Sequence, residues 1–131
     1  MLVEDNEDHA VLVKKTLASA QIPNEVKVFE TAEYALRYLK DHRHAMPQVI
    51  LLDINLPAKS GLELLEDLKK DPTLKRIPVV ILSTSDADVD RLLAYELGAN
   101  SYLTKPVDFH AFRRMIKDFG DYWGKWNRSV P

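Results

Sequence analysis

The chain of 131 residues contains no cysteine. This absence excludes disulfide bonds, thiolate metal sites, iron–sulfur clusters and a cysteine nucleophile. Only 4 glycines are present, and they form neither a GxGxxG nor a Walker pattern, so nucleotide-binding loops of those types are not expected. Any chemical site must therefore be built from oxygen and nitrogen side chains.

Long apolar runs and long basic runs are also missing. No stretch approaches the ~20 apolar residues that a membrane-spanning helix needs, and the first residues lack the basic flank and apolar segment of a signal peptide. The 18 basic and 20 acidic residues give a formal net charge of -2, which offers no concentrated basic face for nucleic acid. We therefore predict a cytoplasmic protein that binds neither membranes nor nucleic acid.

Five short apolar runs alternate with five amphipathic segments. The runs are rich in Val, Ile and Leu, as buried strands are, and cover residues 2–3, 26–29, 49–52, 79–82 and 102–103. The segments between them repeat apolar residues at helical spacing over 10–17, 32–39, 62–68, 89–97 and 109–119. This alternation predicts one α/β domain, in which a parallel sheet carries helices on both faces.

Local signals mark the ends of several elements. Thr31 and Asp108 are predicted N-caps, and Gly98 is expected to end the fourth helix. The last helix is expected to end near Phe119, which leaves 120–131 as a short aromatic extension without a separate output domain. Only three residues precede Glu4, so we expect that leading residues were trimmed or are missing.

Polar side chains follow four of the five predicted strands. They are Glu4 and Asp5 after the first strand, Asp53 at the end of the third, Ser83 and Thr84 after the fourth, and Lys105 after the fifth. The carboxyl ends of parallel strands share one edge, where α/β proteins bind ligands, so these groups should converge. Clustered carboxylates favour a hard cation such as Mg²⁺, and a carboxylate beside it can attack phosphorus. We predict a Mg²⁺-dependent phosphoryl site centred on Asp53.

Five motifs, in this order, resemble a two-component response regulator receiver domain of the CheY-like type. They are Val3–Asn6, Leu52–Pro57 with Gly61, Pro78–Thr84, Gly98–Ala99 and Tyr102–Pro106. The similarity runs from Met1 to about Phe119. It implies a receiver domain over 1–119, with a doubly wound, flavodoxin-like sheet of five parallel strands in the order 2-1-3-4-5.

The resemblance also implies roles for the site residues. For the metal, the implied ligands are Asp5, Asp53 and the backbone carbonyl of Asn55, with Glu4 acting through a metal-bound water. For the phosphoryl group, Asp53 is the implied acceptor, and the implied contacts are Ser83, Thr84 and Lys105, with a cis bond from Lys105 to Pro106. The implied switch pair is Ser83 and Tyr102.

By this resemblance the protein is a stand-alone regulator and not an enzyme acting on a separate substrate. It would accept a phosphoryl group from a sensor histidine kinase or a phosphotransfer protein. The output would pass through the face of the fourth helix, fifth strand and fifth helix, and a homodimer could form there or through 120–131. The chain is similar to small regulators that pair with phytochrome-type kinases.

Two other functions compete with this interpretation. A phosphorylation-independent pseudo-receiver would be a pure interaction module, and the complete set of carboxylates argues against it. A phosphatase of the haloacid dehalogenase type also uses a strand-end Asp with Mg²⁺. It needs a second Asp two residues further on as general acid, and this chain has Asn55 there.

Several residues also fit purely structural roles. Tyr102 fits an ordinary strand aromatic. Tyr122, Trp123 and Trp126 fit either an interface or a cover over the core. The remaining predictions assign Phe109, Phe112, Met115 and Phe119 to the core, and His9, His42, His44 and His110 to the surface.

Overall fold

Five parallel strands form one sheet in the order β2-β1-β3-β4-β5, in a computed structural model that describes residues 1–22 and 25–131. The strands are β1 (Leu2–Val3), β2 (Val28–Phe29), β3 (Ile50–Leu52), β4 (Val79–Ser83) and β5 (Ser101–Thr104). Fold class and strand order are as predicted. The strand ends differ from the apolar runs by one or two residues.

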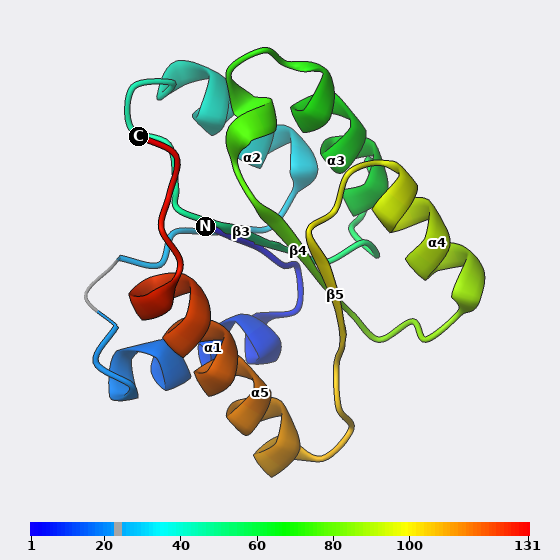
Figure 1. Cartoon of the computed structure of the whole chain (residues 1–131). Coiled ribbons are helices and arrows are strands. Elements are labelled where there is room, and N and C mark those ends of the chain that lie inside the picture. The colour runs from blue at the N-terminus through cyan, green and yellow to red at the C-terminus, as the bar shows by residue number, and fades with distance from the viewer. Residues whose placement is uncertain (23–24) are drawn as a thin grey trace.

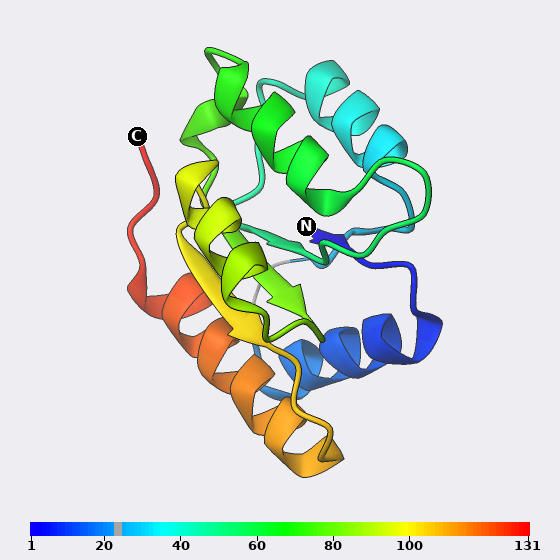
Figure 2. The same cartoon turned by 90° about the vertical axis from the view of Figure 1, so that its right-hand side faces the viewer.

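Helices cover both faces of the sheet (Figure 1 and Figure 2). They are α1 (Glu7–Ser19), α2 (Ala32–Asp41), α3 (Gly61–Lys70), α4 (Asp88–Glu96) and α5 (Phe109–Asp121). α1 and α5 pack on one face, and α2, α3 and α4 pack on the other. The protein is thus a three-layer sandwich.

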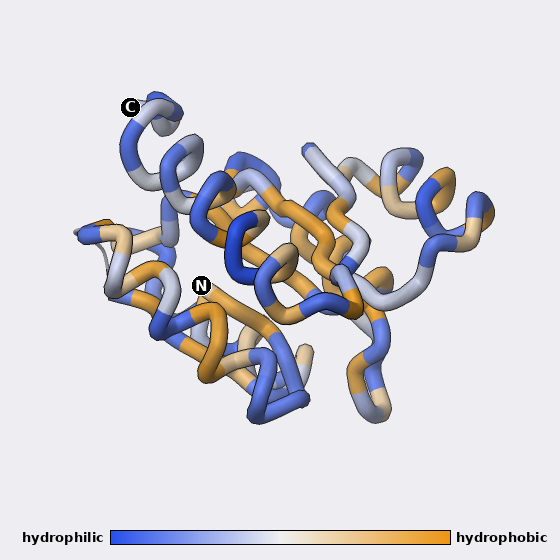
Figure 3. Tube along the Cα trace, turned by 90° about the horizontal axis from the view of Figure 1, so that it is seen from below, coloured by the Kyte–Doolittle hydropathy of each residue, from blue (hydrophilic) through white to orange (hydrophobic). Residues whose placement is uncertain are grey.

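The continuous apolar runs fill two cores because successive strand residues point to opposite faces. In β3, Leu51 joins the core under α1 and α5, while Ile50 and Leu52 join the core under α2 and α3. Figure 3 shows the strands as an apolar centre surrounded by more hydrophilic segments. This packing fixes the strand ends, and with them the loops that carry the polar residues.

The predicted helix boundaries hold at three positions. The Thr31 side chain accepts a hydrogen bond from the Tyr34 amide at 3.2 Å, and the Asp108 carboxylate accepts one from the Ala111 amide at 3.2 Å. Gly98 follows α4 with φ of +103°, a conformation that favours glycine at helix ends. Local sequence signals therefore place these ends correctly.

One core prediction is wrong, and one predicted apolar stripe lies on the surface. The apolar stripe of α4 faces solvent, with Val89 69% exposed and Leu92 and Leu93 also exposed, and Ala94 is the buried residue of this helix. α4 lies along the edge strand β5, so a small side chain suffices for its contact with the sheet. Phe109 is exposed as well, because it stands in the first turn of α5, before the helix reaches the core at Phe112.

The C-terminal end of α5 is longer than predicted. The helix runs to Asp121 and continues into a π-helical turn, Tyr122–Trp126. Trp123 packs against the core under α1 and α5, whereas Tyr122 and Trp126 are exposed, Trp126 by 76%. One aromatic side chain of this segment thus covers the core, and two remain on the surface.

Candidate functional site

Three acidic side chains meet at the carboxyl edge of the sheet. Glu4 follows β1 and Asp53 follows β3, and both are buried, while Asp5 is exposed beside them. Carboxylate oxygens of the three residues lie within 4.8 Å of one another. Such a group of oxygen ligands suits a hard divalent cation, so the residues fit the predicted Mg²⁺.

Lys105 reaches into this group from the end of β5. Its Nζ donates to Glu4 Oε1 at 2.5 Å and to Asp53 Oδ2 at 3.0 Å, and it lies 3.0 Å from Nδ1 of His9. An ammonium group has three N–H donors, so every donor of Lys105 has a partner. The side chains of Lys105, Glu4 and Asp53 are at most 8% exposed, so these charges interact with little solvent screening.

The carboxylates of Glu4 and Asp53 share the buried Lys105 ammonium, and the pKa of Glu4 is shifted in these surroundings. Burial, followed by the hydrogen bond with Asp53, raises the pKa of Glu4, and Lys105 opposes both effects, so the net result is a pKa of about 7. A divalent cation among the three acidic side chains would favour the ionised form of Glu4. The site therefore gains electrostatically from binding one.

His9 belongs to the site, which corrects the prediction that all four histidines are ordinary surface residues. It lies in the first turn of α1, and its ring centroid is 5.4 Å from that of Phe112. Burial, followed by the charge of Lys105, lowers the pKa of His9. Nδ1 can accept from Lys105 only in the neutral ring with the proton on Nε2. The available sequence signal was its position one turn into the helix that follows Glu4 and Asp5.

The loop from β3 to α3 folds back tightly against Asp53. The backbone N–H of Asn55 donates to Asp53 Oδ1 at 3.0 Å. Gly61 packs so closely that a Cβ on it would lie 2.1 Å from the Asp53 carbonyl oxygen, and Ala58 between them has a φ of +60°. The loop thus holds the Asp53 carboxylate in place.

The remaining predicted residues surround the same edge. Ser83 is fully buried and its Oγ accepts from the Ser85 amide at 3.1 Å, while Thr84 is exposed. Tyr102 is half-buried and its hydroxyl donates to the Ser85 carbonyl at 3.0 Å. Both members of the predicted switch pair therefore contact one residue of the loop that follows β4.

The peptide bond between Lys105 and Pro106 is not cis. No cis bond occurs in the described ranges, so the expectation drawn from the resemblance is wrong at this bond. The trans form is the lower-energy isomer before proline.

Comparison with known proteins decides the family. The sequence profile of the response regulator receiver domain matches residues 1–117. The chain belongs to the response regulator receiver family. Every residue of the strand-end site described above lies within the matched part of this receiver domain.

Relatives match this receiver domain over nearly its whole length. The probable methanogenesis regulatory protein FilR2 of Methanothrix harundinacea is 37% identical over 98% of this chain and 85% of its own. A crystal structure of the Mn²⁺-bound form of response regulator Rcp1 is 34% identical, and one of the phosphorylated cyanobacterial phytochrome response regulator RcpA is 38% identical. Each superposes with a TM-score of 0.92 and covers 99% of this chain and 96% of the other.

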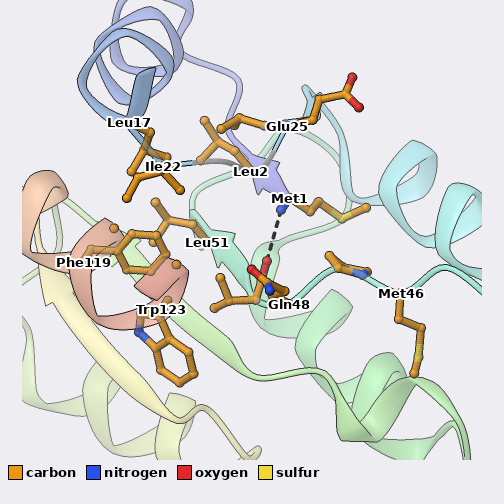
Figure 4. A pocket seen from close by; sticks show the side chains of 15 residues that line it. Met1, Leu2, Leu17, Ile22, Glu25, Met46, Gln48, Leu51, Phe119 and Trp123 are labelled. Carbon is orange, nitrogen blue, oxygen red and sulfur yellow. Dashed lines mark hydrogen bonds between the residues drawn. The ribbon is translucent and has the colours of Figure 1, made fainter. Parts of the chain in front are cut away.

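The opposite edge of the sheet differs in character. A cavity of about 260 Å³ lies there, with Leu17, Leu51, Phe119 and Trp123 among its lining side chains (Figure 4). Its surface is mainly apolar.

No helix in the described part of the receiver domain is long and apolar enough to cross a membrane.

Proposed function

We propose that this receiver domain is a cytoplasmic response regulator that takes a phosphoryl group onto Asp53 from a histidine kinase or phosphotransfer protein. A carboxylate oxygen of Asp53 would bond to phosphorus as the phosphorus–nitrogen bond of the phosphohistidine breaks. The electron pair would leave with the histidine nitrogen, and an aspartyl phosphate would result. The observation that carries this proposal is the buried Lys105 ammonium on Asp53, beside Glu4 and Asp5.

The chain's own groups would stabilise the transferred charge. The Lys105 ammonium lies next to the position of the incoming phosphoryl oxygens, and a turn of the Ser83 hydroxyl would supply a further donor. Thr84, the exposed residue after Ser83, is a further proposed contact of the phosphoryl group. The Asn55 amide orients Asp53 for attack through its hydrogen bond to Oδ1.

Mg²⁺ is the proposed cofactor. Asp5, Asp53 and the Asn55 carbonyl would hold it, and Glu4 would bind through a water. When bound, the cation neutralises charge on the phosphoryl oxygens. The acidic group described above supports this assignment, as does the Mn²⁺-bound structure of Rcp1.

Phosphorylation is tested by incubation with Mg²⁺ and acetyl phosphate, followed by intact mass measurement. The wild-type protein should gain one phosphoryl group, and Asp53→Asn should gain none. Asp86→Asn removes an exposed carboxylate in a neighbouring loop and should behave as wild type. Equal incorporation in Asp53→Asn would reject the assignment, and no incorporation in any protein would favour the pseudo-receiver alternative.

Metal binding is tested separately, by Mg²⁺ titration. Asp5→Ala removes a proposed ligand, so it should weaken Mg²⁺ binding at least about tenfold, since the lost attraction acts at close range. Lys105→Ala removes a nearby positive charge, so it should leave the affinity unchanged or raise it. An equal loss of affinity in both variants would reject this division of roles.

The proposed output is a change in the surface formed by α4, β5 and α5. Phosphorylation would draw Ser83 and Lys105 towards the new dianion, and Tyr102 would lose its bond to Ser85 and turn inward. The exposed Val89 and Leu92 of α4 give this surface the apolar character of a contact site.

A homodimer through this surface or through 120–131 is one form the output could take. Light scattering with and without beryllofluoride tests it. Removal of 122–131 should shift a dimer towards monomer without affecting Asp53, whereas a wild-type protein that is monomeric in both conditions would exclude the dimer.

We do not propose an activity on a separate substrate. The phosphatase alternative needs a general acid two residues after Asp53, and the side chain there is the amide of Asn55, which cannot donate a carboxylic proton. The same Asn55 Nδ2 lies 3.4 Å from Ser83 Oγ, so it is engaged with the proposed switch residue instead.

A further inference from the structure

A second polar site lies on the helical layer formed by α1 and α5, which run side by side in Figure 1 and Figure 2. The α1–α5 groove has a volume of about 380 Å³. It is lined by Thr16, Ser19 and Ala20 at the end of α1 and by His110, Arg113, Arg114 and Lys117 of α5. None of these residues belongs to the strand-end site.

The groove carries positive charge that the fold leaves unbalanced. Arg113, Arg114 and Lys117 are exposed, and none of them forms an ion pair with another described residue. Arg113 and Lys117 are four residues apart on one helix, where like charges disfavour the helix slightly. None of the three cations is therefore held by an ion pair within the described chain.

The buried residue of the groove also lacks a partner. Thr16 is 4% exposed, and its Oγ1 is buried without a hydrogen bond within the described chain. Buried hydroxyl groups normally have partners, because losing water without one costs free energy. Val13 and Leu17 of the same helix are buried and apolar, and valine would fill the space of Thr16 equally well. The Thr16 hydroxyl is therefore a polar group whose missing hydrogen bond a ligand from outside the chain could supply.

We propose that the α1–α5 groove binds a small polyanion of the phosphate class, independently of phosphoryl transfer to Asp53. The guanidinium groups of Arg113 and Arg114 can each donate two parallel hydrogen bonds to phosphate oxygens, and the Lys117 ammonium adds a point charge. The Thr16 Oγ1 is closed off from solvent in the unliganded protein, and a turn about χ1 would bring this hydroxyl to the groove as a neutral donor. The volume suits a small ligand, and the chain has no extended basic face of the kind that nucleic acid needs.

Calorimetric titration with inorganic pyrophosphate tests this proposal. The full chain is used at constant ionic strength with EDTA, so that the strand-end site holds no Mg²⁺. We expect saturable binding of one pyrophosphate. Arg113→Gln and Lys117→Gln should each weaken it at least about fivefold through the lost charge contacts.

Thr16→Val separates a binding role from a structural one. The variant should weaken pyrophosphate binding about threefold or more, and it should raise the Tm of the unliganded protein by about 3 °C because the unpartnered hydroxyl is gone. Lys40→Gln is the matched control, since it removes an exposed cation from α2, and it should bind as wild type.

Each remaining outcome would overturn the proposal. These outcomes are no saturable binding, equal weakening in Lys40→Gln, and undiminished binding in Thr16→Val. A loss of binding in Asp53→Asn would place the anion at the strand-end site instead. If a poly-glutamate peptide binds in a Thr16-dependent manner and pyrophosphate does not, the groove recognises an acidic protein segment. Because Mg²⁺ and phosphodonor are absent, none of these results depends on whether Asp53 is phosphorylated.

Discussion

The two edges of the central sheet differ in what their side chains do. At the carboxyl edge, Glu4, Asp53 and Lys105 are buried charges that depend on one another. At the amino edge, Leu51 and Trp123 border a mainly apolar cavity, beside the hydrogen bond from the Met1 nitrogen to the Val49 carbonyl. The sheet thus has a cluster of interacting charged side chains at its carboxyl edge and mainly hydrophobic contacts at its amino edge.

The two edges therefore differ in what they contribute to the free energy of unfolding. Burying ionised groups costs free energy even when they are paired, whereas burying apolar surface stabilises by about 25 cal/mol per Å². We therefore expect the carboxyl edge to limit stability and the amino edge to supply it. Four variants test this contrast.

Gly61→Ala should have the largest effect. Its Cβ would collide with the Asp53 backbone, which cannot move without displacing β3, so we expect a loss of at least about 3 kcal/mol in the free energy of unfolding. Ser60→Ala is the matched control, because it removes only the N-cap bond to Glu63 and should cost about 1 kcal/mol. Urea unfolding of both variants compares them. Equal losses would mean that the close approach at Gly61 is easily relieved.

Glu4→Gln should change how stability depends on pH. The pKa of Glu4 rises from 4.5 in the unfolded chain to about 7 in the folded protein, so the unfolded state binds fewer protons between these values. Wild-type stability should therefore fall as pH rises from 4.5 through 7, by up to about 3 kcal/mol. The variant should lack this part of the decline.

Urea unfolding in EDTA at pH 5, 6, 7 and 8 measures the effect of Glu4. Glu96→Gln, an exposed carboxylate at the end of α4, is the control and should keep the wild-type profile. Parallel profiles for Glu4→Gln and wild type would show that Glu4 ionises normally.

Trp123→Ala should weaken the amino edge. The indole is half-buried against the core, so its loss should cost about 2 kcal/mol, less than for a fully buried aromatic. Trp126→Ala removes the same side chain from an exposed position three residues later and should stay within about 0.5 kcal/mol of wild type. Thermal unfolding of both variants and the wild type measures these losses of stability. Similar losses would mean that the π-helical turn, and not the contact of Trp123, matters.

Ala58→Gly should have the smallest effect, and its sign is opposite. Ala58 adopts a φ of +60°, which glycine reaches without the steric cost that an L side chain pays. The substitution should stabilise the protein by about 0.5 kcal/mol, after the extra entropy of glycine in the unfolded chain is subtracted. Ala99→Gly at a buried position is the control and should destabilise. Destabilisation by Ala58→Gly would show that the loop is not strained there.

The carboxyl edge was predicted in more detail than the amino edge. Glu4 and Asp53 directly follow apolar runs and Lys105 follows one after Thr104, and parallel topology then brings the three together regardless of the helices. The packing of Trp123 and the exposure of Phe109 depend on where α5 crosses the sheet, which helical spacing does not specify. His9 escaped prediction for the same reason, since its contact with Lys105 depends on the path of α1 relative to β5.

The hydrogen bonds of Lys105 have a consequence for how the signal arises. All three donors are already taken by Glu4, His9 and Asp53, so under the proposed function an arriving phosphoryl group would meet an occupied ammonium. Phosphorylation would then replace existing hydrogen bonds of Lys105 and would not add bonds to free donors. Aspartate carries one negative charge and an aspartyl phosphate dianion carries two, so the carboxylates would be weaker partners of Lys105 than the phosphoryl group that would displace them. Under the proposed function, the free energy available for signalling would be the difference between these two sets of bonds, and Glu4 and His9 would be competitors that set its size.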